Sequence, residues 1–413
     1  MAKRASLIKE LLILVRNRTA FIAVIAAVAV LKLAFSAMAP ASNDLQAITV
    51  FPIFNNSPWV ILEGQVFNFW RWATSSSVAD PSNWALTAPS KMSLNLNLLS
   101  LLLRLPAFVA DVGVAFMLYL ITRRLTRSTE LSRLSSIVWF LNPYNFLAAE
   151  LLGVPDIVVA LLVVITVFLL LYDHFVFASI ILSFGIILKL YPILLVPPII
   201  LYVVHTTGFD WRKTIALIGF SVVGVGGYLS WIFPQSVAVL NADYTPVSQP
   251  MNLTLVSFSP GQGATISFTL AGLVLVYLLM WSKKLALTSG VALTLLSYYL
   301  FSNPYLQYFI WVTPFLTLDI ILVKKKRATL FSLLMIFILA YWWMLSQGFP
   351  TPSRFSLLLL PLSQSLTAVM NSAVTQELLI PLLNAGVYAV VFAYILDMIR
   401  DAFMKRNIVI EGV

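Results

Sequence analysis

Residues 157–204 read IVVALLVVITVFLLLYDHFVFASIILSFGIILKLYPILLVPPIILYVV, and the charged side chains in this stretch are Asp173 and Lys189. A helix needs about 20 mainly apolar residues to cross the roughly 30 Å hydrocarbon core of a membrane. Comparable apolar runs recur from residue 20 to residue 399. The sequence therefore predicts an all-α fold, a polytopic membrane bundle of about twelve helices that forms a single domain over residues 1–413.

The composition agrees with a membrane protein, because 60% of the 413 residues are hydrophobic, 10% are charged and the mean hydropathy is +0.94. No water-soluble domain needs so much apolar surface. The net charge of +10 lies in short basic clusters between apolar runs, which indicates topology rather than nucleic-acid binding. Without cysteine and with two histidines, any metal would have to bind to carboxylates.

We predict membrane spans at residues 20–38, 98–122, 134–149, 157–171, 175–188, 190–204, 214–233, 264–281, 285–302, 305–323, 328–346 and 378–399. The stretch 174–204 would make one helix of roughly 45 Å, which is too long for one crossing. Lys189-Leu190-Tyr191-Pro192 interrupts it, so two spans are expected to meet there at the outer face. One kinked, tilted helix is the alternative.

The basic residues set the orientation, because most of the 26 lie at the N-terminus, around Arg124, Lys213, Lys284 and Lys325, and after residue 399. This side is predicted to be cytoplasmic and to hold both termini. The long connections 39–97, 234–263 and 347–377 then lie outside, where a substrate site is expected. Aromatic residues in the first outer loop, 39–97, predict short interfacial helices.

Asp44 is the first candidate for chemistry, because it follows the first span in Pro40-Ala41-Ser42-Asn43-Asp44. A carboxylate just outside a membrane helix can accept a proton from a hydroxyl or hold a divalent cation. A solvated aspartate that caps the next helix is the structural alternative.

Arg104 and Asp111 lie seven residues apart in one span, hence on one helix face. Charges at that depth are expected to face the bundle interior or a wet cavity. Asp111 could be a structural partner of another helix, and Arg104 could bind a lipid phosphate. Glu150 and Asp156 bracket the next outer turn, where they could contact substrate or stabilise a helix end.

Lys189 is one of few basic residues predicted on the outer side, and it lies at a helix break. It could extend its ammonium to the membrane interface, or it could bind a phosphate beside the broken helix ends. Arg354, in the last outer loop 347–377, is a similar candidate.

Several short motifs in this chain resemble multispan glycosyltransferases of the GT-C superfamily. They are Leu103-Arg104-Leu105-Pro106 with Asp111, Asn142-Pro143, Asp156, and Lys189-Leu190-Tyr191-Pro192 with Val196-Pro197. The segment Asn303-Pro304-Tyr305-Leu306-Gln307-Tyr308-Phe309-Ile310-Trp311 with Pro314 is similar to a stretch of the mannosyltransferase family that adds the first mannose to GPI anchors.

The resemblance implies an inverting transferase that takes a sugar, mannose in this family, from a polyprenyl- or dolichyl-phosphate donor on the non-cytoplasmic face. The acceptor would be a lipid-linked or other glycan. Asp44 matches the first-loop acidic motif and would be the general base. Family members often carry two acids there, and this chain has Asn43-Asp44, so dependence on Mg²⁺ or Mn²⁺ stays open. The other residues expected to bind substrate are Asn43, Arg104, Glu150, Asp156, Lys189, Tyr191, Gln307 and Arg354.

Two other functions stay open. The related GPI transamidase subunit shares some of these features, so the chain could be a non-catalytic subunit of a membrane complex; Asp44 favours the enzyme. A solute transporter or lipid flippase also suits about twelve spans, but an internal repeat or charges spread through many spans would then be expected.

Overall fold

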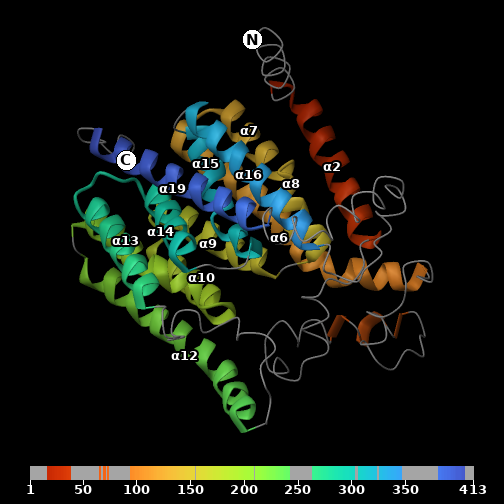
Figure 1. The fold of residues 1–413 in the computed structure, drawn as a ribbon, viewed down its shortest axis with the longest axis horizontal. Coiled ribbons are helices and arrows are strands. Elements are labelled where there is room, and N and C mark those ends of the chain that lie inside the picture. Colours follow the sequence, from red (N-terminus) through yellow and green to blue (C-terminus); the bar gives the residue numbers. More distant parts are fainter. Residues whose placement is uncertain are drawn as a thin grey trace. The chain divides into compact units, whose positions relative to one another are not determined.

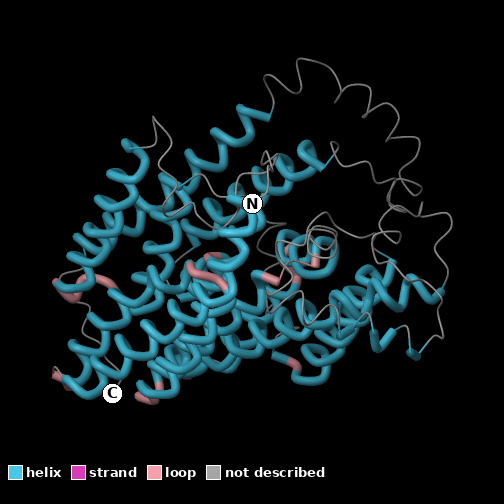
Figure 2. The backbone as a smooth tube through the Cα atoms, turned by 90° about the horizontal axis from the view of Figure 1, so that it is seen from below, coloured by secondary structure: helices cyan, strands magenta, loops and turns pink. Residues whose placement is uncertain are grey.

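The computed structural model describes residues 16–38, 65–66, 68–70, 72–73, 94–153, 155–208, 210–241, 263–302, 306–322, 325–346 and 380–404. These residues are mainly helical, and none of them lies in a strand, which confirms the all-α class (Figures 1 and 2). The principal helices are α2 (Arg18–Met38), α6 (Leu94–Thr126), α7 (Thr129–Phe140), α8 (Pro143–Phe146), η3 (Leu147–Leu152), α9 (Asp156–Leu171), α10 (Phe175–Leu188), η4 (Tyr191–Leu195), α11 (Val196–Thr207), α12 (Trp211–Asn241), α13 (Gly263–Trp281), α14 (Leu287–Ser302), η5 (Leu306–Trp311), α15 (Thr313–Leu322), α16 (Lys325–Ser346) and α19 (Ile380–Met404).

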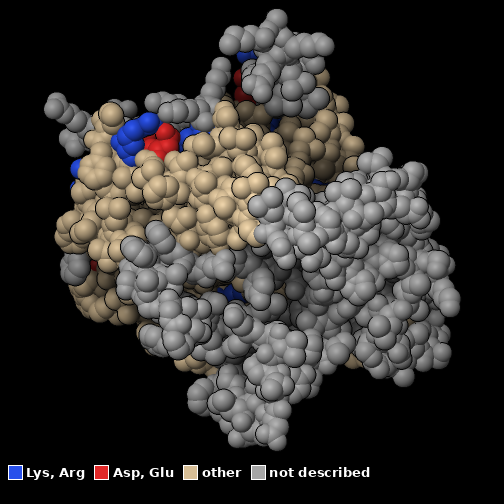
Figure 3. Space-filling view, viewed as in Figure 1, with Lys and Arg blue, Asp and Glu red and all other residues tan. Residues whose placement is uncertain are grey.

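Four of these helices are long and apolar enough to cross a membrane, and their candidate spans are Arg18–Ala37, Leu98–Thr126, Trp211–Ser230 and Pro381–Met404. Several shorter apolar helices of 10–17 residues accompany them. The face of the described residues seen in Figure 3 is largely uncharged, with lysine, arginine and acidic side chains in small groups. The chain is a multi-pass membrane protein, whereas the count of about twelve crossings stays a prediction.

The chain divides into two compact units. Unit 1 comprises Met1–Val158 and Phe331–Val387, and unit 2 comprises Val159–Leu330 and Tyr388–Val413. In unit 1, α6 packs against α2 and α7, and η3 contacts α2, α6 and α8. In unit 2, α10 packs along α12 and α13 packs against α14, while α11 contacts α12, α13 and α14. Single-domain behaviour of residues 1–413 stays a prediction.

The predicted span 134–149 is wrong as one continuous helix, because the chain breaks at Asn142-Pro143. Proline disfavours helical backbone in the residue before it, and Asn142 is extended at φ −66° and ψ 117°. Its side chain accepts a hydrogen bond from the Tyr144 N–H at 3.0 Å, so it caps the short helix α8. The π-helix η3 follows and ends at Gly153, whose φ of 67° is left-handed.

The break predicted at Lys189–Pro192 is confirmed. α10 ends at Leu188, Lys189 is extended, and the chain continues through the 3₁₀ helix η4 into α11. A second 3₁₀ helix, η5, occupies the start of the predicted span 305–323, which is therefore also wrong as one α-helix. Pro314 lies in the first turn of α15, where its missing N–H costs no hydrogen bond.

The first outer loop is described at a few positions between residues 65 and 73, and these are helical, as predicted for short helices there. Trp70 is 1% exposed. Phe69 and Trp72 are exposed, and their ring centroids lie 5.9 Å apart.

Candidate functional site

Unit 2 brings two of the predicted motifs together around Lys189. The Lys189 ammonium lies 4.2 Å from the centre of the Tyr308 ring and 5.5 Å from that of the Trp311 ring. Lys189 and Tyr191 lie at the α10–η4 break, and Tyr308 and Trp311 belong to η5. Two helix breaks that are more than 100 positions apart in sequence therefore meet at one cation. We call Lys189, Tyr191, Tyr308 and Trp311 the Lys189 site.

The rings of the Lys189 site are tightly stacked. Tyr191 stacks on Trp311 with ring centroids 3.7 Å apart and planes 7° apart, and Tyr308 lies 4.6 Å from Trp311 at 17°. All three rings are buried, whereas Lys189 is partly exposed. The stacked rings thus hold the two 3₁₀ helices, η4 and η5, against each other. The electron-rich faces of these rings stabilise an ammonium in apolar surroundings.

Two further tyrosines belong to this region, and sequence reasoning missed both. Tyr298 of α14 lies 6.3 Å from Trp311, centroid to centroid. Tyr228 of α12 interacts electrostatically with Lys189 and Tyr308. Neither residue lies in a recognisable motif, because each sits among apolar residues of a helix. Together with Tyr191 and Tyr308 they bring phenol groups from four different elements into this region.

Unit 1 contains a second polar group, the Lys32 cluster, made of Lys32, Asp111 and Glu150. The Lys32 ammonium donates to Asp111 Oδ2 at 2.6 Å and lies 3.3 Å from Glu150 Oε1. It also lies 4.4 Å from the centre of the Phe140 ring. The indole N–H of Trp139 donates to Asp111 Oδ1 at 2.9 Å. Asp111 is thus a structural partner of other helices, the role suggested for it by the sequence.

The remaining predicted residues in unit 1 are also buried. Arg104 is 0% exposed and donates from Nη1 to the Ser100 hydroxyl at 2.6 Å, so its side chain faces the protein interior rather than the lipid surface. Asp156 is the first residue of α9 and is 2% exposed. A carboxylate at that position stabilises the positive end of the helix dipole. Roles of Arg104 and Asp156 toward substrate stay predictions.

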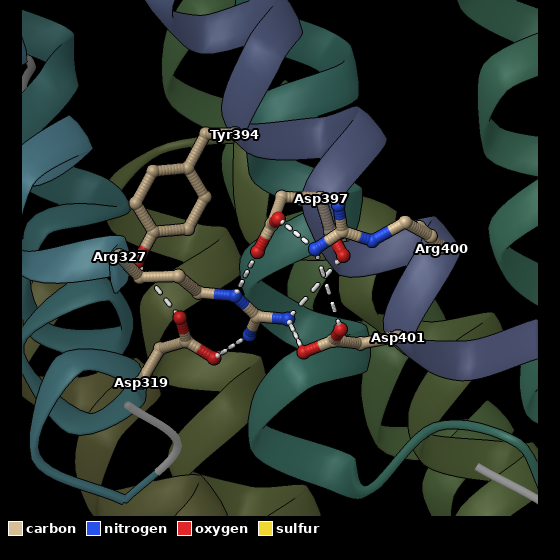
Figure 4. A network of polar contacts seen from close by, with 6 residues as sticks. All are labelled: Asp319, Arg327, Tyr394, Asp397, Arg400 and Asp401. Atoms are coloured by element: carbon tan, nitrogen blue, oxygen red, sulfur yellow. Dashed lines mark hydrogen bonds and ion pairs between the residues drawn. The ribbon is translucent and has the colours of Figure 1, made fainter. Parts of the chain in front are cut away.

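A third polar group, the Arg327 network, contains Arg327, Asp319, Tyr394, Asp397, Arg400 and Asp401 (Figure 4). Arg327 pairs with Asp319 at 2.6 Å, Asp397 at 2.9 Å and Asp401 at 2.6 Å, and the Tyr394 hydroxyl donates to Asp319 at 2.7 Å. The network joins α15, α16 and α19 within unit 2. Each of its three carboxylates pairs with at least one arginine, so we assign it a structural role.

Several predicted site residues lie outside the described residues, namely Asn43, Asp44 and Arg354. Gln307 lies in η5, in the same short helix as Tyr308. Among the described residues, no group of three or more histidine, cysteine or acidic side chains is arranged to hold a metal ion. Asp44 therefore stays the predicted ligand of any bound metal ion.

One protein family matches part of this chain. Residues 82–263 match the family described as GPI transamidase subunit PIG-U. A search of curated proteins gives no match. The matched range covers less than half of the chain, and it includes Arg104, Asp111, Glu150, Asp156 and Lys189. The match agrees with the second relative expected from the sequence, the transamidase subunit, and the similarity to the mannosyltransferase stays a prediction.

Proposed function

We propose that this protein is a membrane glycosyltransferase that takes a sugar from a polyprenyl-phosphate donor and that Lys189 binds the donor phosphate. The observation that carries the proposal is the convergence of Lys189 with rings from two broken helices. A lipid-linked donor must enter sideways from the bilayer, so its phosphate needs a cation at membrane depth. Lys189 supplies one, in a surrounding where charge–charge attraction is stronger than in water.

The stacked rings explain why Lys189 suits a phosphate. A lysine on a long flexible stem loses conformational freedom when it binds, and the contacts with Tyr308 and Trp311 reduce that loss by fixing the stem beforehand. An ammonium has three N–H donors, so a phosphate oxygen can act as an acceptor beside its cation–π contacts. Trp311 stacks with two tyrosines and lies beside the ammonium, so we assign it to holding Lys189.

In the proposed reaction the acceptor hydroxyl oxygen attacks the anomeric carbon of the donor sugar. The bond from that carbon to the phosphate oxygen breaks, the electron pair leaves with the polyprenyl phosphate, and the configuration inverts. Asp44 takes the hydroxyl proton as the new bond forms. Lys189 stabilises the negative charge that develops on the departing phosphate.

The match to the transamidase subunit family favours a second candidate function. In that case the chain would hold a lipid-linked glycan for a partner subunit and would transfer nothing itself. In both candidate functions Lys189 would contact a lipid phosphate, because the sugar donor and the lipid-linked glycan would each carry one. The two functions differ in whether the isolated protein forms a glycosidic bond.

The donor-binding prediction concerns Lys189→Met, which removes the charge and retains most of the stem. A charge-assisted contact contributes about 1.5 to 3 kcal/mol, so apparent donor affinity should fall roughly tenfold to a hundredfold. The measurement is transfer of radiolabelled sugar from dolichyl-phosphate-mannose by purified protein, as a function of donor concentration. Lys213→Met is the matched control, because Lys213 also lies over an aromatic ring, Phe175, at 4.7 Å. Equal donor dependence in both variants would contradict a phosphate role for Lys189.

The catalytic prediction concerns Asp44→Asn, which keeps the size of the side chain and removes the base. Turnover should fall by about 10² to 10⁴ while donor binding is retained. Chelation followed by addition of Mg²⁺ or Mn²⁺ tests whether Asp44 acts through a metal instead. Donor binding that depends on Lys189, without transfer from any polyprenyl-phosphate sugar tried, would support the second candidate function and exclude the first.

A further inference from the structure

The Lys32 cluster places two buried carboxyl groups against one ammonium. Lys32 comes from α2, Asp111 from α6 and Glu150 from η3, and their side chains are 2%, 0% and 0% exposed. If all three groups were ionised, the cluster would carry a net charge of −1 inside the protein. An uncompensated charge without water or a counter-ion is strongly unfavourable.

Asp111 is the carboxyl group that the surroundings are built to hold as an anion. Its two oxygens accept hydrogen bonds from the Lys32 ammonium at 2.6 Å and the Trp139 indole at 2.9 Å. Glu150 differs from it. Neither oxygen of Glu150 accepts a hydrogen bond from the residues that the structure describes, and its separation from the ammonium is 3.3 Å. Glu150 is therefore the surplus acid of the cluster.

The position of Glu150 in a π-helix supports this reading. Single-turn π-helices inside helical proteins occur frequently at functional sites. Here the turn between Asn142 and Gly153 carries Glu150 inward to the cluster, next to Asp111, with which it interacts electrostatically. Two carboxylates repel each other, whereas a proton on one of them turns the same contact into a hydrogen bond.

We infer that Glu150 is a proton-binding site, which holds one proton at neutral pH and shares it with the carboxylate of Asp111. With that proton the cluster is neutral, because Lys32 balances Asp111. Without it, two negative charges face one positive charge, and α2, α6 and η3 should separate or admit water. This inference is independent of the proposed sugar transfer.

Among the described residues, η3 packs mainly against α2, α6 and α8, and these elements supply the charged groups considered around Glu150. The ionisable groups facing it are Lys32 from α2 and Asp111 from α6, while α8 carries Tyr144, a phenol that is uncharged at neutral pH. Lys32 favours ionisation of Glu150 and Asp111 opposes it. Since Lys32 lies closer to Asp111 than to Glu150, the proton is assigned to Glu150.

The test compares two changes from acid to amide, Glu150→Gln and Asp111→Asn, in full-length protein purified in detergent. Glutamine resembles a protonated glutamate, so Glu150→Gln should keep the wild-type thermal midpoint at pH 7, and Asp111→Asn should lower it. Infrared spectra should show the C=O stretch of a protonated carboxylic acid in the wild type, with loss of that component in Glu150→Gln. A component that survives in Glu150→Gln and disappears in Asp111→Asn would overturn the assignment to Glu150.

The pH dependence of unfolding supplies a second measurement. The folded protein keeps a proton that an exposed glutamate gives up near pH 4.3. The free energy of unfolding should therefore fall as the pH rises above about 4.3, until Glu150 itself ionises in the folded state. Glu150→Gln should lack this part of the slope. Two results would show that Glu150 is ionised and would overturn the inference. One is an equal slope of the free energy of unfolding against pH in the wild type and in Glu150→Gln. The other is a Glu150→Gln protein that unfolds as readily as Asp111→Asn.

Discussion

The role of the charge on Arg327 depends on the residues that surround it in the fold. It follows Lys324, Lys325 and Lys326, and the sequence counts all four as cytoplasmic loop charges. In the structure Arg327 is 3% exposed and pairs with three carboxylates of α15 and α19. A planar guanidinium can serve several carboxylates at once, which an ammonium does less well.

We predict that Arg327→Met destabilises the protein by about 3 to 5 kcal/mol, because it leaves the buried carboxylate of Asp319 without its counter-charge. Arg400→Met is the control. Arg400 pairs with Asp397 but is 49% exposed at its side chain, so its loss should cost about 0 to 1 kcal/mol. Thermal unfolding in detergent compares the two variants. Similar midpoints for both would argue against a structural role of the Arg327 network.

At the scale of elements, α10 and α12 pack closely because α12 presents glycine to α10. A Cβ at Gly224 would lie 3.0 Å from the backbone oxygen of Ser183 and 3.0 Å from Ile186 Cβ. Backbone atoms cannot move aside as a flexible side-chain end can. Small residues of this kind let membrane helices approach each other and gain van der Waals contact.

We predict opposite effects for two alanine substitutions on α12. Gly224→Ala should destabilise the protein by about 1 to 3 kcal/mol, because the methyl group forces α10 and α12 apart. Gly226→Ala should be neutral or stabilising by up to about 1 kcal/mol, because a Cβ there meets nothing within 4 Å and alanine favours helix. Unfolding midpoints of both variants test this. A destabilising Gly226→Ala with a neutral Gly224→Ala would contradict the packing described for α10 and α12.

Local sequence patterns predicted the elements better than the contacts between them. Apolar runs located most of the helices, and Pro192 located the break after Lys189. The stacking of Tyr191 on Trp311 could not be predicted, because no local pattern links positions so far apart in the chain. A partner on another helix was one possibility for Asp111, but no sequence pattern identifies Lys32 as that partner.

The limits of local sequence patterns also explain why two predicted spans are wrong. Spans 134–149 and 305–323 were predicted from hydropathy, which does not distinguish an α-helix from a broken or 3₁₀ segment of equal apolarity. Asn142-Pro143 carries the signal for the first break, because proline disfavours helical backbone in the residue before it. For the candidate site, Lys189, Tyr191 and the segment around Gln307 were predicted, whereas Tyr228 and Tyr298 carry no signal in an apolar helix.

At the scale of the whole molecule, the orientation in the membrane can be tested because the chain has no cysteine. We predict that single cysteines at Arg124 and Lys213 react with an impermeant maleimide from the cytoplasmic side. Cysteines at Asp44 and Lys189 should react from the outer side. Labelling in right-side-out and inverted vesicles gives the readout. Reaction of positions 44 and 124 from the same side would contradict the predicted topology.

The Arg327 network also constrains the order of events while the protein is made. Arg327 leaves the ribosome 70 positions before Asp397 and 74 before Asp401, which is several seconds of synthesis at about 5 to 20 residues per second. During that interval Asp319 has been synthesised, but Arg327 still lacks its two partners on α19, and with Lys324 to Lys326 it adds to the positive charge that we predict keeps this loop in the cytoplasm. The arrival of α19 then supplies Asp397 and Asp401. One arginine thus acts first as an orientation signal for the nascent chain and afterwards as the attachment point of a late helix.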